Sequence, residues 1–239
     1  MRRLYCQDFN IGRAKITGPE VHHGRDVLRL KPGDPVELFD GRGQSAQATV
    51  EQLLKSEIQL RINETQTSPL TKPRITLATA IPKFAHQETL VRMATELGIS
   101  VFRPIIFARS SVREQFRSEK WRRWTIEACK QCGMNYLPEL KEAIDFKDLI
   151  KMVGEYDLTI FGHTKSTMGN DLSERLKQSE TILLVVGPEG GFTEDELLGL
   201  QNIGALPIQI GQNILRIETA AVALSTVITF LSSRWRQSP

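Results

Sequence analysis

The residues best placed to do chemistry gather at the sequence GPEGG, which begins at Gly187 and follows the apolar segment Ile182 to Val186. An apolar run of this length suits a strand covered on both faces, and the glycines supply the backbone freedom of a sharp turn. Thr193 and Glu196 form a capping-box pair, which marks the start of a helix. A glycine turn at the carboxyl end of a strand indicates a ligand site, although such turns also serve as plain strand-to-helix connections.

The charge around this turn narrows the class of ligand. Glu189, Glu194, Asp195 and Glu196 crowd the amino end of the expected helix, where they suit the helix dipole but repel an anion. The turn also lacks the glycine spacing and the lysine of phosphate-binding loops. The sequence therefore predicts a neutral or partly cationic ligand.

The elements that must position this turn alternate between strand and helix. The strands are expected at Arg74 to Ala80, Val101 to Phe107, Asp157 to Phe161, Ile182 to Val186 and Pro207 to Ile210. The helices are expected at His86 to Leu97, Ser118 to Cys132, Phe146 to Val153, Glu194 to Ile203 and Thr219 to Leu231. This alternation predicts an α/β fold with a mainly parallel sheet. The last helix is apolar nearly all round, so we expect it to be buried in the fold or against a second subunit.

Residues 1 to about 70 are rich in short β-forming segments and predict a small barrel. The expected elements are strands at Arg2 to Cys6, Pro35 to Asp40, Gln47 to Leu54 and Glu57 to Asn63, and a short helix at His22 to Leu30. The dipeptide Asp40-Gly41 predicts a hairpin turn, with Gly43 allowing a bulge. The polar stretch Asn63 to Pro73 is the expected linker, which divides the chain into domains 1–70 and 74–239.

The composition is that of a soluble globular protein of 239 residues with a net charge of +3. A signal segment and a membrane-spanning run are not expected, so the sequence predicts a cytoplasmic protein without a membrane partner. Cys129 and Cys132 form a single CxxC pair, which is expected to pack on a helix, with a redox pair as the alternative. His22 and His23 are adjacent and point in different directions, so no metal site is expected.

Basic residues gather between Arg103 and Lys130, where Trp121 and Trp124 interrupt them. This pattern suits a face that follows nucleic-acid phosphates while the rings stack on bases. It suits equally a solvated helix face whose tryptophans turn to the core. The residues alone leave both interpretations open.

Two stretches, LLVVGPEGGFTEDE from Leu183 and IGQNILRIETAA from Ile210, resemble the RsmE-type small-subunit ribosomal RNA (uracil-N3)-methyltransferases of the SPOUT superfamily. The resemblance covers most of the chain. It implies a PUA-like β-barrel that binds RNA, then a SPOUT domain with a carboxyl-terminal trefoil knot, and a homodimer. The implied function is S-adenosylmethionine-dependent methylation of uracil N3 in small-subunit ribosomal RNA. The alternatives are a methyltransferase of the same fold acting on another RNA site and a non-catalytic RNA-binding assembly protein.

The same resemblance implies a site for S-adenosylmethionine around the glycine turn, where acids would not oppose the positive sulfonium. The implied cofactor-binding residues are Phe161, Gly162, His163, Val186, Gly187, Pro188, Glu189, Gly190, Gly191, Ile210, Gly211, Leu215, Arg216, Thr219 and Ala220.

Attack by uracil N3 on a methyl group requires that N3 lose its proton, and a cation near the uracil oxygens would stabilise the resulting anion. Arg216 is expected to supply that cation, with Glu218 orienting it or Glu189 assisting the proton. The alternative is a structural ion pair between Arg216 and Glu218. His163 is a further candidate for the base, because an imidazole transfers protons near neutral pH.

RNA contacts are expected from basic residues of both domains. The candidates are Arg2, Arg3, Arg25, Arg29, Lys31, Arg42, Arg109, Arg113, Arg117, Arg122 and Arg123. Met93, Met134 and Asn213 depart from the family pattern, because a basic residue is usual at each position. These departures leave the turn unchanged and bear on RNA affinity and on the choice of uridine.

Overall fold

The computed structural model describes residues 2–111, 116–165 and 172–236. The chain divides into two compact units. Residues Met1–Leu70 and Ile126–Leu137 form the N-terminal unit, and residues Thr71–Thr125 and Pro138–Pro239 form the C-terminal unit. The long helix α3 (Ser118–Cys132) contributes residues to both units.

The described part of the N-terminal unit forms a five-stranded sheet in the order β1-β3-β4-β5-β2. Its strands are β1 (Arg2–Tyr5), β2 (Gly12–Thr17), β3 (Pro35–Phe39), β4 (Gln44–Leu53) and β5 (Glu57–Thr67). The pairing of β1 with β3 is parallel, and the other pairings are antiparallel. Apolar side chains that alternate along these strands, such as Leu4, Leu38 and Leu60, are fully buried and form the core of this unit.

The hairpin predicted at Asp40-Gly41 is confirmed by the antiparallel pairing of β3 with β4. Gly41 and Gly43 have φ angles of 77° and 104°, which glycine adopts without strain. The Asp40 carboxylate accepts hydrogen bonds from the backbone amides of Arg42 (2.7 Å) and Gln44 (2.9 Å). The turn is therefore fixed by its own side chain as well as by the glycines.

Two predictions for this unit were wrong in detail, and one strand was missed. The polar stretch from Asn63 is not a linker at its start, because β5 continues to Thr67 and pairs with the beginning of β4. Strand β2 was missed, because it is an edge strand in which only two side chains are buried. The expected helix at His22 to Leu30 is replaced by α1 (Pro19–His22) and the π-helical turn η1 (His23–Val27).

The segment 126–137 completes the N-terminal unit through hydrogen bonds to its strands and turns. Arg3 Nη1 donates to the carbonyl oxygens of Cys129 (2.7 Å) and Met134 (3.0 Å). The Tyr136 hydroxyl donates to the carbonyl oxygen of Ser68 at 2.9 Å. Residues far apart in sequence therefore share one hydrogen-bonded unit.

The described part of the C-terminal unit forms a seven-stranded sheet in the order β12-β10-β11-β6-β7-β8, with β9 also paired to β7. Every pairing in this sheet is parallel. The strands are β6 (Arg74–Ala80), β7 (Val101–Ile106), β8 (Glu139–Leu140), β9 (Ile144–Asp145), β10 (Leu158–Gly162), β11 (Thr181–Val186) and β12 (Leu206–Ile208). The predicted mainly parallel α/β sheet is confirmed.

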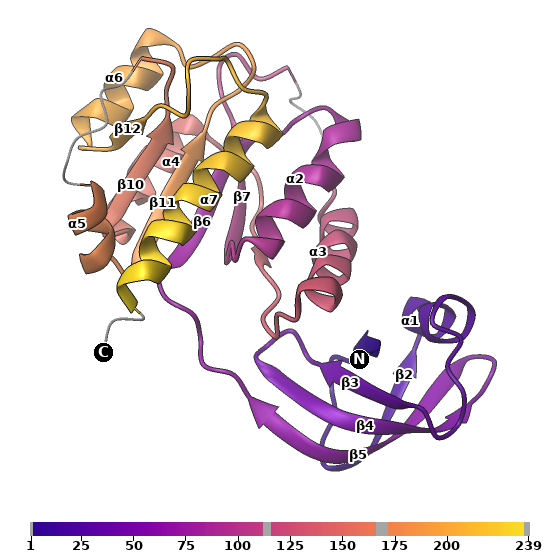
Figure 1. The fold of residues 1–239 in the computed structure, drawn as a ribbon. Coiled ribbons are helices and arrows are strands. Elements are labelled where there is room, and N and C mark those ends of the chain that lie inside the picture. Colours follow the sequence, from indigo (N-terminus) through magenta and orange to yellow (C-terminus); the bar gives the residue numbers. More distant parts are fainter. Residues whose placement is uncertain (1, 112–115, 166–171, 237–239) are drawn as a thin grey trace. The chain divides into compact units, whose positions relative to one another are not determined.

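Helices cover this sheet on both faces (Figure 1). They are α2 (Phe84–Glu96), α3, α4 (Phe146–Met152), the 3₁₀ turn η2 (Val153–Glu155), α5 (Leu172–Gln178), α6 (Glu194–Asn202) and α7 (Ile217–Arg236). Helix α7 crosses the sheet over β6 and β11 and packs beside α2, while α4 lies behind the strands in the same view. None of the helices in the described ranges is both long and apolar enough to cross a membrane.

The predicted burial of the last helix is confirmed for one of its faces. Ala221, Leu224 and Ile228 are at most 1% exposed and pack in the core. The helix begins two residues before the expected start and runs to Arg236. Phe230 is 55% exposed, so the apolar surface of α7 extends beyond the core-facing side.

The CxxC pair lies on α3 with its two thiols in different environments. Cys129 is buried, which raises the pKa of its thiol to about 12, and Cys132 is exposed. Burial also raises the pKa of Cys6. This arrangement favours packing over redox chemistry, because the thiolate is the reactive form.

In the folded protein we therefore expect only Cys132 to react rapidly with Ellman's reagent at pH 8. Cys132→Ser should remove the fast phase, Cys6→Ser should leave it unchanged, and guanidinium unfolding should expose all three thiols. A second fast thiol assigned to Cys129, or a Cys129–Cys132 disulfide found by mass spectrometry, would restore the redox interpretation.

Asp157 joins the first residues of β10 and β11. Its carboxylate accepts hydrogen bonds from the backbone amides of Glu180 (2.8 Å) and Thr181 (2.9 Å) and from the Thr181 hydroxyl (3.0 Å). These bonds, those from the Thr181 backbone above all, hold the pKa of Asp157 below its ordinary value. A carboxylate whose pKa is lower in the folded than in the unfolded protein stabilises the fold at pH values above its unfolded pKa of about 3.9. This contribution is lost as the pH falls and the carboxylate becomes protonated.

Asp157→Asn should accordingly lower the melting temperature at pH 7, and the gap from the wild type should narrow as the pH falls below about 4. The neighbouring exposed carboxylate Glu155 provides the control, since Glu155→Gln should leave the melting temperature nearly unchanged. A gap for Asp157→Asn that is constant from pH 7 to pH 3 would contradict a role for the charged carboxylate.

Candidate functional site

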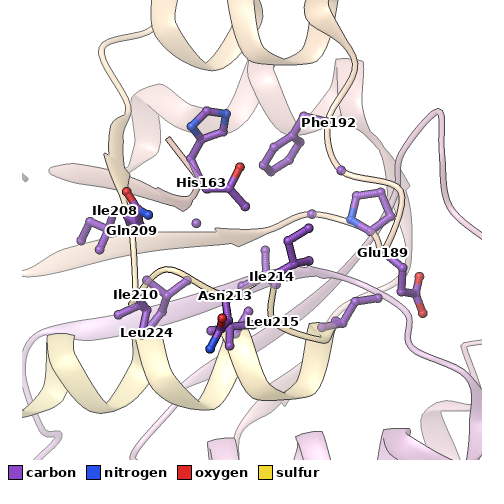
Figure 2. Close-up of a pocket in the computed structure, with 18 of the residues that line it drawn as sticks. His163, Glu189, Phe192, Ile208, Gln209, Ile210, Asn213, Ile214, Leu215 and Leu224 are labelled. Carbon is purple, nitrogen blue, oxygen red and sulfur yellow. The ribbon is translucent and has the colours of Figure 1, made fainter. Parts of the chain in front are cut away.

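A cavity of about 240 Å³ lies within the C-terminal unit where three neighbouring strands end. Its walls come from the segments that follow β10, β11 and β12 and from the first turns of α7. Figure 2 shows His163 and Phe192 on one side, Asn213 and Leu215 on the opposite side, and Glu189 at one end. The cavity therefore occupies the carboxyl edge of the sheet, the position that α/β folds use for ligands.

The glycine turn, here residues Gly187 to Gly191, forms one wall of this cavity. The Gly191 amide donates to the Pro188 carbonyl at 2.9 Å, and Gly191 has a φ of 70°. The predicted capping box is confirmed, because the Thr193 hydroxyl accepts from the Glu196 amide while the Glu196 side chain accepts from the Thr193 amide. The turn is thus held by the helix that follows it.

The structure brings most of the predicted cofactor residues together. Ten of them line the cavity, namely Gly162, His163, Val186, Gly187, Pro188, Glu189, Gly191, Ile210, Leu215 and Ala220. Five do not line it, namely Phe161, Gly190, Gly211, Arg216 and Thr219. Phe161 is 1% exposed and packs beneath the site against the Phe192 ring, with ring centres 5.9 Å apart.

Sequence reasoning missed nine residues that line the cavity, namely Thr164, Phe192, Leu197, Ile208, Gln209, Asn213, Ile214, Ile217 and Leu224. Two signals were present for some of them. Phe192 and Leu197 occupy the positions of a hydrophobic staple around the capping box. Ile217 and Leu224 share one face of α7 with the predicted Ala220, because they lie three and four residues from it.

Charge is sparse in the cavity wall. Among the described residues that line it, Glu189 is the one carboxylate, and lysine and arginine are absent. The Ser111 hydroxyl donates to Glu189 Oε2 at 3.2 Å and orients this carboxylate. An apolar cavity with one acid at its end suits a neutral or partly cationic ligand, which is the class that the sequence predicts.

The structure separates the residues predicted for catalysis. Arg216 is exposed just before α7, and Glu218 lies 3.4 Å from His86 Nδ1 instead of facing Arg216. Within the described ranges no ion pair joins Arg216 to Glu218, so the alternative of a structural ion pair was wrong. His163 lines the cavity, and its Nδ1 lies 2.8 Å from the carbonyl oxygen of Lys165.

Arg3 is the predicted RNA contact that lies deepest in the protein. It is 7% exposed, its guanidinium lies 4.4 Å from the centre of the Phe39 ring, and it donates to two backbone carbonyls. This position indicates a structural role in the N-terminal unit. Burial removes Arg3 from the surface where a phosphate would bind.

The other predicted RNA contacts of the N-terminal unit lie at or near its surface. Three of them form ion pairs with carboxylates, Arg2 with Asp34, Arg25 with Asp26, and Arg42 with Asp8 and Asp40. Arg29 and Lys31 are exposed. An arginine already paired with an acid must give up that pair, or share it, to bind a phosphate.

The basic stretch of the C-terminal unit combines features of both interpretations. Trp121 and Trp124 are 0% and 4% exposed and pack in the core, which agrees with the interpretation of core-facing tryptophans and rules out stacking of these rings on bases. Arg117, Arg122 and Arg123 are exposed, and the Phe84 ring, which is 55% exposed, lies 4.5 Å from Lys120 Nζ and 6.0 Å from the guanidinium carbon of Arg117. Arg113 lies outside the described residues, and the Arg109 guanidinium binds backbone carbonyls of the glycine turn region.

Comparisons with known proteins agree with the fold and the cavity. A family model for an RNA methyltransferase domain matches residues 69–229, and a model for an RNA methyltransferase PUA domain matches residues 16–63. The ribosomal RNA small subunit methyltransferase E of Rickettsia conorii is 35% identical over 97% of this chain and 96% of its own length. The protein of the same name from Aquifex aeolicus is 33% identical over 95% of this chain and 99% of its own length.

A solved structure extends the comparison to three dimensions. The crystal structure of a ribosomal RNA small subunit methyltransferase E from Neisseria gonorrhoeae, bound to S-adenosyl methionine, has a TM-score of 0.85 and 29% identity over 97% of this chain and 98% of its own. The fold and the site thus define an RNA methyltransferase with a PUA domain. The chain belongs to the ribosomal RNA small subunit methyltransferase E family, as its sequence motifs predicted.

Proposed function

We propose that this protein methylates N3 of a uracil in small-subunit ribosomal RNA, with S-adenosylmethionine as the methyl donor. The observation that carries the proposal is the cavity at the carboxyl edge of the sheet, which joins the glycine turn to the start of α7. Its apolar walls and single carboxylate fit a cofactor that has a neutral ring system and a positive sulfonium. A nucleotide phosphate would find neither lysine nor arginine among the described lining residues.

The residues that would hold the cofactor are those of the glycine turn, the segment after β12 and the first turns of α7. When bound, the cofactor supplies an activated methyl group. Backbone amides and carbonyls of the turn can bind the polar edge of its ring, and Ile210, Leu215 and Leu224 cover apolar surface. Glu189 attracts the positive end, which by Coulomb's law is worth on the order of 1 kcal/mol across about 4 Å in water.

The substrate must lose the N3 proton before the nitrogen can act as a nucleophile. We assign to Arg216 the stabilisation of the uracil anion, because it carries an exposed cation and its neighbours in sequence, Leu215 and Ile217, both line the cavity. Glu189 and His163 are the groups in the cavity wall that can accept a proton, and both remain candidates for this step. We propose that Glu218, which pairs with His86, has a supporting role at the start of α7.

Two measurements test the proposal. Mass spectrometry of digested small-subunit ribosomal RNA should find 3-methyluridine in cells with the gene and a loss of that nucleoside in cells without it. Calorimetry should give a titratable heat with S-adenosylmethionine. An unchanged level of 3-methyluridine together with cofactor binding would favour action on another RNA site, and RNA binding without cofactor binding would favour a non-catalytic assembly protein.

The departures from the family pattern bear on these alternatives. Asn213 lines the cavity, Met93 is 42% exposed on α2, and Met134 is half-buried in the N-terminal unit. Each position lacks the usual cation. Restoring a basic side chain, for example with Asn213→Arg, should tighten RNA binding if this position faces the substrate, and a filter-binding titration would measure the change.

We also propose a homodimer, a trefoil knot in the C-terminal unit, RNA contacts from the PUA domain and a cytoplasmic location, all of which stay predictions. The exposed Phe230 and the half-buried Val227 on α7 support a second copy, because an apolar helix surface favours association. Light scattering should then give about twice the chain mass of 27.0 kDa. A mass equal to that of one chain would contradict the dimer.

A further inference from the structure

The loop after β7, here residues Phe107 to Ser111, is fastened to the glycine turn by an arginine. Arg109 Nη1 donates to the carbonyl oxygens of Gly190 (3.1 Å) and Phe192 (3.2 Å). Both acceptors belong to the segment that connects β11 to α6. One guanidinium therefore binds two carbonyl groups of this connecting segment.

Two more hydrogen bonds join the same two segments. The Ala108 amide donates to Glu196 Oε1 at 2.8 Å, and the Ser111 hydroxyl donates to Glu189 Oε2 at 3.2 Å. Arg109 thus lies between two other connections, one to the capping carboxylate and one to the acid at the end of the cavity. The loop therefore contacts four residues of the segment from Glu189 to Glu196, two of which, Glu189 and Gly190, belong to the glycine turn.

The loop is itself held in a fixed shape. The Ser110 amide donates to the Phe107 carbonyl at 3.1 Å, and the Phe107 amide donates to the Ser110 hydroxyl at 3.0 Å. The Phe107 ring is buried and packs edge-on against the Phe192 ring, with centres 5.5 Å apart. A loop with this internal bonding can act as a rigid support for a neighbouring segment.

The glycine turn needs such a support. Three of its five residues are glycine, which adopts many backbone conformations, so the free turn would spread over several shapes. The absence of a Cβ at Gly190 also permits the close approach, because a Cβ there would lie 3.1 Å from Arg109 Cβ. Hydrogen bonds from a charged donor are stronger than neutral ones and favour the one shape whose carbonyls face the arginine.

We propose that Arg109 is a positioning residue, which holds the glycine turn in the shape that accepts the cofactor. This role differs from the RNA contact predicted for the same residue, and the identity of the cofactor rests on the proposed function. When only a fraction of molecules has the competent turn, the apparent dissociation constant rises by the inverse of that fraction. Loss of Arg109 therefore weakens cofactor binding even though the side chain does not line the cavity.

The test compares Arg109→Ala, Arg109→Lys and the wild type without RNA, so that phosphate contacts have no part in the result. Hydrogen–deuterium exchange of the ligand-free protein should be faster at the amides of residues 187–193 in Arg109→Ala, at unchanged melting temperature. Calorimetry with S-adenosylmethionine should give at least fivefold weaker binding. Arg109→Lys should give an intermediate effect, because lysine keeps the charge but lacks the planar set of donors.

Arg92→Ala is the matched control, because it removes an arginine of the same unit that pairs with Glu88 on α2. This variant should exchange and bind as the wild type does. Equal exchange of the turn in Arg109→Ala and the wild type would overturn the inference, as would equal cofactor affinity. Failure of the wild type to bind S-adenosylmethionine would count against the proposed function instead, and the ligand-free exchange would still decide the role of Arg109.

Discussion

Arg216→Ala is expected to lower the rate of RNA methylation more than tenfold and to leave the affinity for S-adenosylmethionine within about threefold of the wild type. A tenfold loss corresponds to about 1.4 kcal/mol of transition-state stabilisation. The side chain is exposed, lies outside the cavity wall and is free of ion pairs within the described ranges. Removing it should therefore cost little cofactor binding or folding stability, and should remove the cation that we propose stabilises the developing uracil anion.

Single-turnover rates at saturating cofactor measure this effect without the contribution of product release. Arg216→Lys should recover part of the rate, because a cation remains, and Arg92→Ala should behave as the wild type does. A fall of many degrees in the melting temperature of Arg216→Ala would indicate a structural role. A loss of cofactor affinity as large as the loss of methylation rate would indicate a cofactor-binding role.

Gly187→Ala should weaken the binding of S-adenosylmethionine at least tenfold. A methyl group at Gly187 would lie 2.8 Å from Cζ and 2.9 Å from Cε1 of Phe192, well inside the carbon–carbon contact distance of about 3.5–4.0 Å. The Phe192 ring lines the cavity and cannot retreat easily, because it packs against the buried rings of Phe107 and Phe161. The substitution must move either the ring or the turn, and both are parts of the cavity wall.

Gly154→Ala is the matched control for this substitution. Gly154 has open space around its Cα, and its backbone shows no positive φ, so a methyl group is accommodated there. Isothermal titration of both variants, with melting curves to confirm folding, gives the comparison. Wild-type affinity in Gly187→Ala would show that the ligand does not depend on the Phe192 side of the cavity.

Much of the C-terminal fold could be predicted because its signals are local. The strand β11, the glycine turn and the capping box at Thr193 each depend on a few neighbouring residues, and all three appear at the expected positions. The two-residue strands β8 and β9 could not be found, because a pattern of period two needs more residues to be visible. Helix α5 was missed for a similar reason, since its core contact rests on Leu172 and Leu176 alone.

The cavity was predictable in part. The turn and the segment at Ile210 carried motifs, whereas Ile208 and Gln209 line the site only because β12 pairs with β10 at the edge of the sheet. That neighbour relation depends on the order of strands in space. The contact between Glu218 and His86 was unpredictable for a similar reason, because the two residues are far apart in sequence and come close only when α2 and α7 pack.

The roles of the arginines were the least predictable feature. Composition identified a basic protein face but could not say which guanidinium groups already have partners. Arg3 donates to carbonyl oxygens in the core of the N-terminal unit, Arg42 pairs with acids, and Arg109 donates to carbonyl groups of the turn, while Arg123 is exposed. Whether a charged side chain faces solvent, pairs with an acid or binds backbone groups depends on contacts that form only in the folded chain.

The inclusion of residues 126–137 in the N-terminal unit limits how this protein can be divided or recombined. A fragment that stops at Leu70 would leave Arg3 without the carbonyl oxygens of Cys129 and Met134, and the loss of hydrogen-bond acceptors by a buried charged group is unfavourable. The N-terminal unit is therefore built from two segments that are not contiguous in the chain. A gene fusion that transplants this unit must therefore carry residues 126–137 as well as residues 1–70.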